Sequence, residues 1–289
     1  MNQMAEQASG GPADPVAASH QHFAPSPLLR PYIKCFHSLR IDNTGGVLPY
    51  ERFTPDGCFE VNFNLADPPQ RKEAVGVEQR LDPSYTVARS SQCYFMRPHG
   101  TLRLLGIRFH PWGLHPFTSL SPSEFADAAV PSAELFGADI SALHERISKA
   151  ATARDGIAEM ERFLLSRLQT GRVDASMVDA AQRIQGSQGR LAQQEVFGTY
   201  GISQRRFQQR FKQHIGMSSK AFTRLTRFQQ ALRTLTADPK TASLDLAFDG
   251  MYYDQSHFVN EFRSFAGVNP SRYSSEAHPL NDAAVLDRA

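Results

Sequence analysis

The sequence has few cysteines and no long hydrophobic run, and both features narrow the class of protein. Its 289 residues include three cysteines, Cys35, Cys58 and Cys93, with no Cys-x-x-Cys pair among them. This usage fits a reducing cytoplasm, where each would be a small, half-buried apolar side chain. No run of eighteen apolar residues occurs, so we expect no membrane span and no membrane partner. We therefore expect a cytoplasmic protein.

Acidic residues are absent from one long segment of the chain. Between Glu195 and Asp238 there is no Asp or Glu, while eight Lys or Arg residues fall there. Residues 180–276 hold thirteen basic residues against seven acidic ones, whereas residues 1–179 hold seventeen against twenty. Neutralising phosphates supplies most non-specific affinity for nucleic acid, so this clustering favours a polyanionic partner. A solvated basic face is the alternative, and charge alone does not decide between them.

Motifs for catalysis are also missing, since no nucleophile elbow, phosphate-binding glycine loop or paired metal motif occurs. His99, His110 and His115 could suggest a metal site in a cupin-like barrel. No carboxylate stands at a suitable spacing, so ordinary loop or partly buried histidines are the preferred interpretation. Trp112 is interpreted as a core or rim aromatic rather than as part of a ligand pocket. We expect no enzymatic activity, no cofactor and no metal.

The hydrophobic pattern divides the chain into parts and predicts an α+β fold. Residues 23–120 contain short alternating runs separated by turn formers, which indicates a β-rich sensor domain, either a small cupin-like barrel or a sandwich. From Ser121 the pattern becomes helical, and residues 121–175 are predicted to form a helical connector. An all-α domain with two helix-turn-helix units follows at residues 176–276. The ends, residues 1–22 and 277–289, are expected to be disordered tails.

A weak internal repeat with an offset of 51 residues lies in the basic region. The equivalent positions are Ser203/Asp254, Phe207/Phe258, Phe211/Phe262 and Gly216/Gly267. Serine and aspartate are both good N-cap residues, so each copy is predicted to begin a helix. The phenylalanines lie four residues apart and form a core-facing stripe in each copy.

The opposite side of each predicted helix carries a polar stripe with i, i+3, i+4, i+7 spacing. The first stripe is Arg205, Gln208, Gln209 and Lys212, and the second is Ser256, Val259, Asn260 and Arg263. Such a face suits the major groove, because Arg can bind guanine bidentately and Gln or Asn can bind adenine. A short helix and a turn precede each copy, which completes two helix-turn-helix units. An apolar-faced helix from Phe222 to Leu235 is predicted between them.

These motifs resemble those of the AraC/XylS family of bacterial transcription regulators over about residues 178–274. The resemblance rests on Gly201-Ile202-Ser203-x-x-x-Phe207-x-x-x-Phe211 with Gly216-Met217-Ser218, and on Tyr252-x-Asp254-Gln255-Ser256-His257-Phe258-x-x-x-Phe262 with Gly267-Val268-Asn269-Pro270. By this resemblance, the base-reading positions would be Arg205, Gln208 and Gln209 in the first helix and Gln255, Ser256, His257, Val259 and Asn260 in the second. Lys212, Arg224, Arg227 and Arg263 complete the predicted DNA-binding set, mainly as phosphate contacts.

Two positions depart from the family pattern. Phe197 stands where the family usually has a small alanine, and Met251 stands where it has a turn glycine. In the front half, Leu104 to Gly113 together with Pro55-Asp56-Gly57-Cys58 resembles a poorly characterised β-rich domain found before this DNA-binding unit. That second resemblance implies a sensor or oligomerisation role.

The sequence thus predicts a sequence-specific transcription regulator that reads two successive major-groove segments and is controlled by its N-terminal domain. Double-stranded DNA is the expected partner, while a small-molecule effector, a homodimer and contact with RNA polymerase stay open. The alternative is a small-molecule-binding or enzymatic N-terminal domain with a non-specific nucleic-acid-binding tail.

Overall fold

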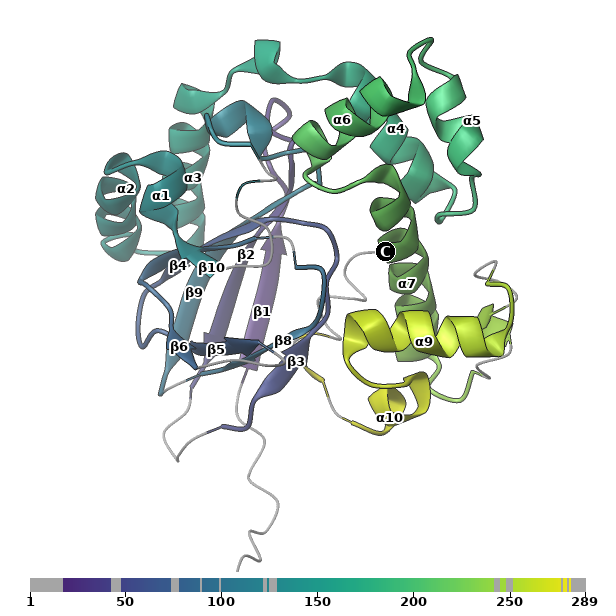
Figure 1. The fold of residues 1–289 in the computed structure, drawn as a ribbon. Coiled ribbons are helices and arrows are strands. Elements are labelled where there is room, and N and C mark those ends of the chain that lie inside the picture. The colour runs from purple at the N-terminus through teal and green to yellow at the C-terminus, as the bar shows by residue number, and fades with distance from the viewer. Residues whose placement is uncertain are drawn as a thin grey trace, which may run out of the picture.

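The computed structural model contains a β-rich N-terminal part and a helical C-terminal part that pack against each other (Figure 1). It describes residues 18–42, 48–73, 78–88, 90–98, 100–121, 124, 129–241, 245–247, 252–276, 278–279 and 281.

Two separate antiparallel sheets make up the N-terminal part. The first, in spatial order, consists of β1 (Ala18–Phe23), β2 (Ile33–Ile41), β9 (Leu102–Phe109), β4 (Glu60–Asn64), β7 (Ser84–Val87) and β10 (Ala129–Pro131). The second consists of β3 (Glu51–Phe53), β8 (Tyr94–Arg97), β5 (Gln70–Glu73) and β6 (Gln79–Arg80). Of the two forms that the sequence left open, the described strands therefore form a pair of open sheets, as in a sandwich, and not a closed barrel.

Alternation along the central strands gives the six-stranded sheet two different faces. Phe36, Ile107 and Val61 are neighbours across β2, β9 and β4, and all three are buried in the main apolar core. The next residue pair along these strands, His37 and Asn62, flanks Gly106 on the opposite face. Since successive side chains of a strand point to opposite faces, the first face packs on helices and the second faces the other sheet.

The helices that cover the apolar face were predicted to be a connector, but they belong to the N-terminal core. They are α1 (Ser132–Phe136), α2 (Asp139–Ser148) and α3 (Ala153–Arg167). Leu143, Met160 and Leu164 are fully buried and join the same core as the sheet. Short 3-10 helices occur at His115–Phe117 and Thr170–Arg172. Part of the helix expected from Ser121 lies outside the described residues.

The predicted tails are shorter than composition indicated. Residues 18–22 lie in β1, which pairs with β2, and are therefore not a disordered tail. At the other end His278 and Asn281 are buried against the rest of the protein. The Asn281 amide donates to the Tyr273 hydroxyl, and its oxygen accepts from Thr54. The polar composition of both segments suggested disorder. Their order depends on partners that are distant in the sequence, β2 for the first segment and Thr54 for the second.

The C-terminal part is entirely helical in its described residues. Its helices are α4 (Ala175–Gly186), α5 (Gln193–Gly198), α6 (Gln204–Ile215), α7 (Ser219–Ala237), α9 (Gln255–Ala266) and α10 (Pro270–Ser275), and residues 245–247 are also helical. As expected, α7 is long, amphipathic and ends before Asp238-Pro239. Its buried face is shared between two apolar clusters, one with α4, α5 and α6 and one with α9 and α10.

The internal repeat predicted from the sequence is present in the local geometry. The Ser203 side chain accepts from the backbone N–H of Arg206, and the Asp254 side chain accepts from that of His257, so both N-caps are confirmed. At the other ends, Gly216 and Gly267 have φ values of 81° and 73°. A left-handed residue closes a helix most easily when it is glycine.

One segment of the N-terminal part, residues 52–57, connects the two parts. Arg52 donates to the backbone oxygen of Ala266 at 2.8 Å and forms an ion pair with Glu276. The Gln229 amide in α7 donates to the backbone oxygen of Pro55. At Gly57, with φ of 81°, an added Cβ would lie 3.2 Å from a methyl carbon of Leu225. The segment therefore lies in direct contact with α7 and with the end of α9.

Replacing Phe262 with Ala should destabilise the C-terminal core by about 3–5 kcal/mol. Its ring is fully buried and contacts the rings of Phe228, Phe258 and Tyr273. Urea denaturation followed by circular dichroism measures the loss. Tyr253→Ala is the control, because Tyr253 is 92% exposed. Unchanged stability of Phe262→Ala would contradict this assignment of the core.

Candidate DNA-binding interface

Helix α6 presents a polar face to solvent. Arg205, Gln209 and Lys212 are exposed, whereas Phe207, Phe211 and Ile215 on the other side are fully buried. The adjacent Arg206 is exposed as well. These positions leave a basic, hydrogen-bonding surface along one side of the helix, as the periodicity predicted.

Gln208, in contrast, is partly buried and already hydrogen-bonded. Its amide nitrogen lies 2.8 Å from the hydroxyl of Ser219, and its oxygen accepts from the backbone N–H of the same residue. Ser219 is the first residue of α7, so Gln208 fixes α6 to the start of α7. Its predicted base contact stays a prediction, but this geometry favours a positioning role.

Two further side chains anchor α6 from its other flank. Arg210 forms an ion pair with Asp174, the N-cap of α4, at 2.6 Å. The His214 ring accepts from the backbone N–H of Asp174, and its centroid lies 4.6 Å from that of the His115 ring of the N-terminal part, with the two ring planes tilted by 48°. The orientation of α6 is therefore set both by α4 and by the N-terminal part.

Helix α9 repeats the exposed stripe in a modified form. Gln255, Ser256, Asn260 and Arg263 are exposed, while Val259 is partly buried against the core. His257 is half exposed, accepts from the backbone N–H of Tyr253 and meets the ring edge of Tyr252. The predicted positions thus lie on one helix face, but Val259 and His257 also have packing roles.

A buried carboxylate joins α9 to α7. Glu261 is 6% exposed, and one of its oxygens lies 2.8 Å from the side chain of Arg224. Arg227 and His257 lie 4.0 Å and 3.7 Å from the same carboxylate group. Arg224 and Arg227 were expected to hold phosphates, and that role stays a prediction. Arg224 is the more closely paired and the more exposed of the two, at 39%, whereas the Arg227 side chain is 19% exposed. The sequence did not indicate the cluster, because Arg224 and Glu261 lie 37 residues apart.

Tyr253 is a candidate interface residue that the sequence analysis missed. It is 92% exposed and stands directly before the N-cap of α9. A large exposed aromatic beside a polar helix face is suited to contact a sugar or base. Its position next to Asp254 in the motif was the available signal.

The two departures from the family pattern have different outcomes. Phe197 is partly buried beside the first core, where its ring centroid lies 6.4 Å from that of Phe207. Phe197 is therefore accommodated by packing against this core. The turn after α5 retains its glycine, Gly201, at a φ of 62°. Met251 and Gly250 lie outside the described residues.

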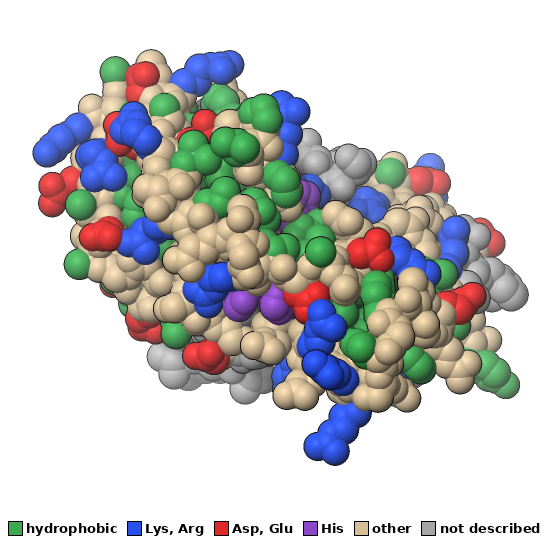
Figure 2. All heavy atoms as spheres, turned by 90° about the horizontal axis from the view of Figure 1, so that it is seen from above, with side chains coloured by type: hydrophobic (Ala, Val, Ile, Leu, Met, Phe, Trp, Pro, Cys, Tyr) green, Lys and Arg blue, Asp and Glu red, His purple; other side chains and the backbone are tan. Residues whose placement is uncertain are grey.

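Neither the charged side chains seen in Figure 2 nor the metal-ligating side chains of the described residues indicate a second site. On the face seen in Figure 2, Lys and Arg side chains stand among acidic and uncharged ones. Within the described ranges, no group of three His, Cys, Asp or Glu side chains is arranged to hold a metal ion. Of the three histidines that could suggest a metal site, His99 lies outside the described residues, His110 stacks on Trp112, and His115 lies at a tilted angle against His214. No described helix is both long and apolar enough to cross a membrane.

Comparison with known proteins finds one matching family model in each part of the chain. Residues 198–276 match a family described as a helix-turn-helix domain, and residues 21–131 match a domain of unknown function, DUF6597. No curated protein matches the chain. A solved structure of ToxT from Vibrio cholerae is similar to this chain, with 10% sequence identity and a TM-score of 0.46. The similarity covers 83% of this chain and 97% of that chain. A second, bound to (E)-4-(8-methylnaphthalen-1-yl)but-3-enoic acid, covers 89% and 98% at 10% identity and a TM-score of 0.44.

The helix-turn-helix geometry and the family match together define a DNA-binding transcription regulator, a class that is generally non-enzymatic. Its C-terminal domain is of the AraC type, and it follows a β-rich domain of the DUF6597 family.

The adjacent imidazoles of His115 and His214 should make the free energy of unfolding fall at acidic pH. Burial lowers the pKa of His115 to about 4 and also lowers that of His214. The ordinary histidine pKa is about 6.5, so as the pH falls the unfolded chain takes up protons before the folded protein does. The contribution of these histidines to the free energy of unfolding is therefore present above about pH 6.5 and is lost as the pH drops toward 4. At pH 5 His115 alone should account for about 2 kcal/mol. Urea midpoints measured between pH 7 and 5 test this, and an unchanged slope in His115→Gln would contradict it.

Proposed function

We propose that α6 and α9 enter two successive major-groove segments on one face of duplex DNA, under the control of the N-terminal domain. The observation that carries this proposal is the pair of exposed polar stripes at equivalent positions of two helices whose other faces are buried. Both helices pack on α7, one near each end in Figure 1.

The length of α7 supports this arrangement. Its 19 residues span about 28 Å. Successive major-groove segments on one face are one helical turn, roughly 34 Å, apart. A rigid helix of this length, fixed to α6 through Gln208 and to α9 through Glu261, is suited to hold two reading helices at that separation.

Exposure divides the predicted residues into roles. Arg205 and Gln209 on α6, and Gln255, Ser256 and Asn260 on α9, would contact base edges. Lys212 and Arg263 would contact phosphates, with Arg224 at the edge of the interface. Gln208, Arg227, His257 and Val259 would hold the helices in position through the contacts described above.

Control by the N-terminal domain would act through residues 52–57. This segment contacts α7 through Pro55 and Gly57, and the carboxyl end of α9 through Arg52. It touches neither polar stripe, so docking leaves both reading faces exposed. By holding α7 and α9 in one arrangement, the docked N-terminal domain would pre-organise the reader.

Replacing Arg205, Gln209 or Asn260 with Ala should weaken binding to a selected duplex by about 1–3 kcal/mol and relax specificity at one base position. Lys212→Ala should weaken all duplexes similarly and reduce the salt slope by about 1. Fluorescence anisotropy at several salt concentrations measures both effects. Arg162→Ala on α3 is the control, since its side chain is 67% exposed in the N-terminal part. Equal binding of all sequences by the three variants would refute the reading face.

Loosening the contact between the two parts should weaken specific binding. Arg52→Gln removes a buried guanidinium that bonds Ala266 and Glu276. We expect several-fold weaker binding to the selected duplex with little change for random duplex, because the arrangement of α9 is no longer fixed. Arg162→Gln serves as the matched control. An unchanged ratio of specific to random binding would speak against control through this contact.

A further inference from the structure

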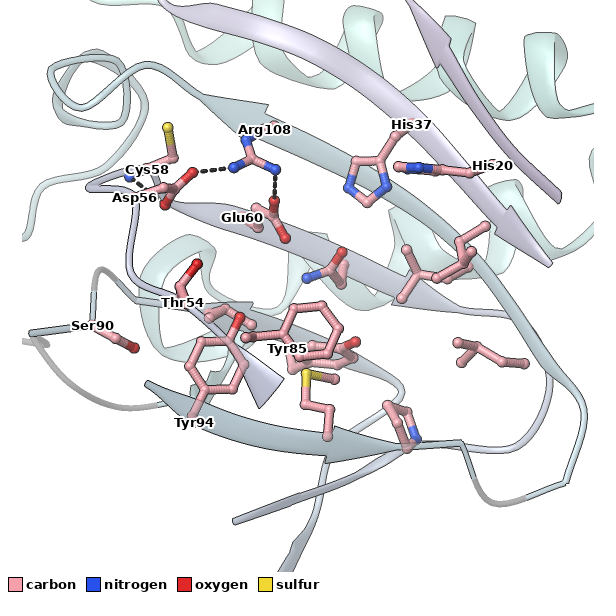
Figure 3. Close-up of a pocket in the computed structure, with 18 of the residues that line it drawn as sticks. His20, His37, Thr54, Asp56, Cys58, Glu60, Tyr85, Ser90, Tyr94 and Arg108 are labelled. Carbon is pink, nitrogen blue, oxygen red and sulfur yellow. Dashed lines mark hydrogen bonds and ion pairs between the residues drawn. The ribbon is translucent and has the colours of Figure 1, made fainter. Parts of the chain in front are cut away.

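A cavity of about 120 Å³ lies between the two sheets of the N-terminal part (Figure 3). We infer that it binds an uncharged small molecule with a ring-sized apolar body and a hydroxyl or amide group directed at His37. The effect of this ligand on DNA rests on the control proposed above, whereas its binding does not.

Strand register builds the polar wall of this cavity. His37 on β2 and Asn62 on β4 are both cross-strand partners of Gly106 on β9. A Cβ at Gly106 would lie 2.0 Å from the His37 ring and 2.8 Å from the Asn62 oxygen. Because Gly106 has no side chain, the side chains of His37 and Asn62 can lie above it at the centre of the sheet, where both line the cavity.

His37 is the polar group that a ligand would satisfy. It is 8% exposed, and neither ring nitrogen has a hydrogen-bond partner. Burial lowers its pKa to about 4, opposed by Glu60 and reinforced by His20, His22 and Arg108. The ring is therefore neutral at pH 7, with one donor and one acceptor. Buried polar groups are nearly always paired, because leaving them unpaired costs stability.

The charges around the cavity select against an ionised ligand. Arg108 forms ion pairs with both Asp56 and Glu60, so its guanidinium is already neutralised and this group of three carries a net charge of −1. Arg97, on the opposite wall, bonds Gln70 and Glu78. Among the described lining residues both arginines are therefore paired, so a carboxylate would meet no uncommitted guanidinium. An ammonium ion, although attracted by the net charge of −1, would have to lose its hydration and displace Arg108 from these carboxylates.

The remaining walls fit an apolar body of modest size. Leu39 and Leu104 come from the six-stranded sheet, and Phe53, Tyr94 and Met96 come from the other. Apolar cavities of about 150 Å³ take up benzene. With about 120 Å³ this cavity is smaller, so a single ring with at most one small substituent is the upper limit of the size that it accepts.

The same cavity borders the contact with the DNA-binding domain. Thr54, Pro55 and Asp56 line it, while Thr54 also bonds Asn281 and Pro55 accepts from Gln229 of α7. A ligand that displaces this segment would move the point where the N-terminal part holds α7.

Three probes with one ring and different charge test the site on the full chain. They are 4-fluorobenzyl alcohol, 4-fluorobenzoate and 4-fluorobenzylamine, followed by fluorine NMR line broadening at pH 7. We expect saturable broadening of the alcohol only, reduced at least fivefold in His37→Phe and retained in His144→Gln, whose imidazole lies outside the cavity. Equal binding of the benzoate or the amine, no binding of the alcohol at millimolar concentration, or an alcohol signal unaffected by His37→Phe would overturn the inference.

Thermal unfolding provides an independent measurement. Since an unpaired buried imidazole costs stability, His37→Phe should raise the Tm of the ligand-free protein by roughly 2–4 °C; a lower Tm would indicate a structural role and count against the inference. If that variant does not fold, the ring ¹⁵N signals of wild-type His37 should shift on adding the alcohol while those of His144 do not, and unshifted His37 signals would overturn it. Probe binding without any change in DNA affinity would refute the proposed control and leave the site intact.

Discussion

Burial of the apolar face of α7 holds the two helix-turn-helix units and the N-terminal part together. Phe222 completes the core that holds α6, and Phe228 packs on Phe262 and Phe265 of α9. Leu225 and Gln229 meet the N-terminal segment around Pro55 and Gly57. Because a single rigid helix contacts all three, the positions of α6, of α9 and of the N-terminal part are linked through it.

Polar contacts add to this apolar packing in fixing α6 and α9 to α7. Gln208 forms hydrogen bonds with the first residue of α7, and Glu261 of α9 forms an ion pair with Arg224 of α7. A buried ion pair adds little net stability once the desolvation of its charges is counted. These contacts instead connect α6 and α9 to α7 at defined positions, and so they set which way each exposed stripe faces.

Features that depend on local sequence were predictable. The N-caps Ser203 and Asp254, the closing glycines and the phenylalanine stripes follow from short-range rules, and all are present. Features that depend on distant partners were not. Pairing with β2 orders residues 18–22, Thr54 orders Asn281, and Glu261 engages the two arginines that were expected to hold phosphates. The cavity was also invisible, because His37 and Asn62 converge only through strand register around Gly106.

Whether α6 and α9 both read DNA can be measured by selecting duplexes from a random pool with the full chain. We expect an enriched motif with two short elements whose centres lie about one helical turn apart. Selection with Arg205→Ala should relax one base position in one element, and selection with Asn260→Ala should relax one base position in the other. Enrichment of a single element, or binding without any enriched motif, would contradict a reader built from α6 and α9.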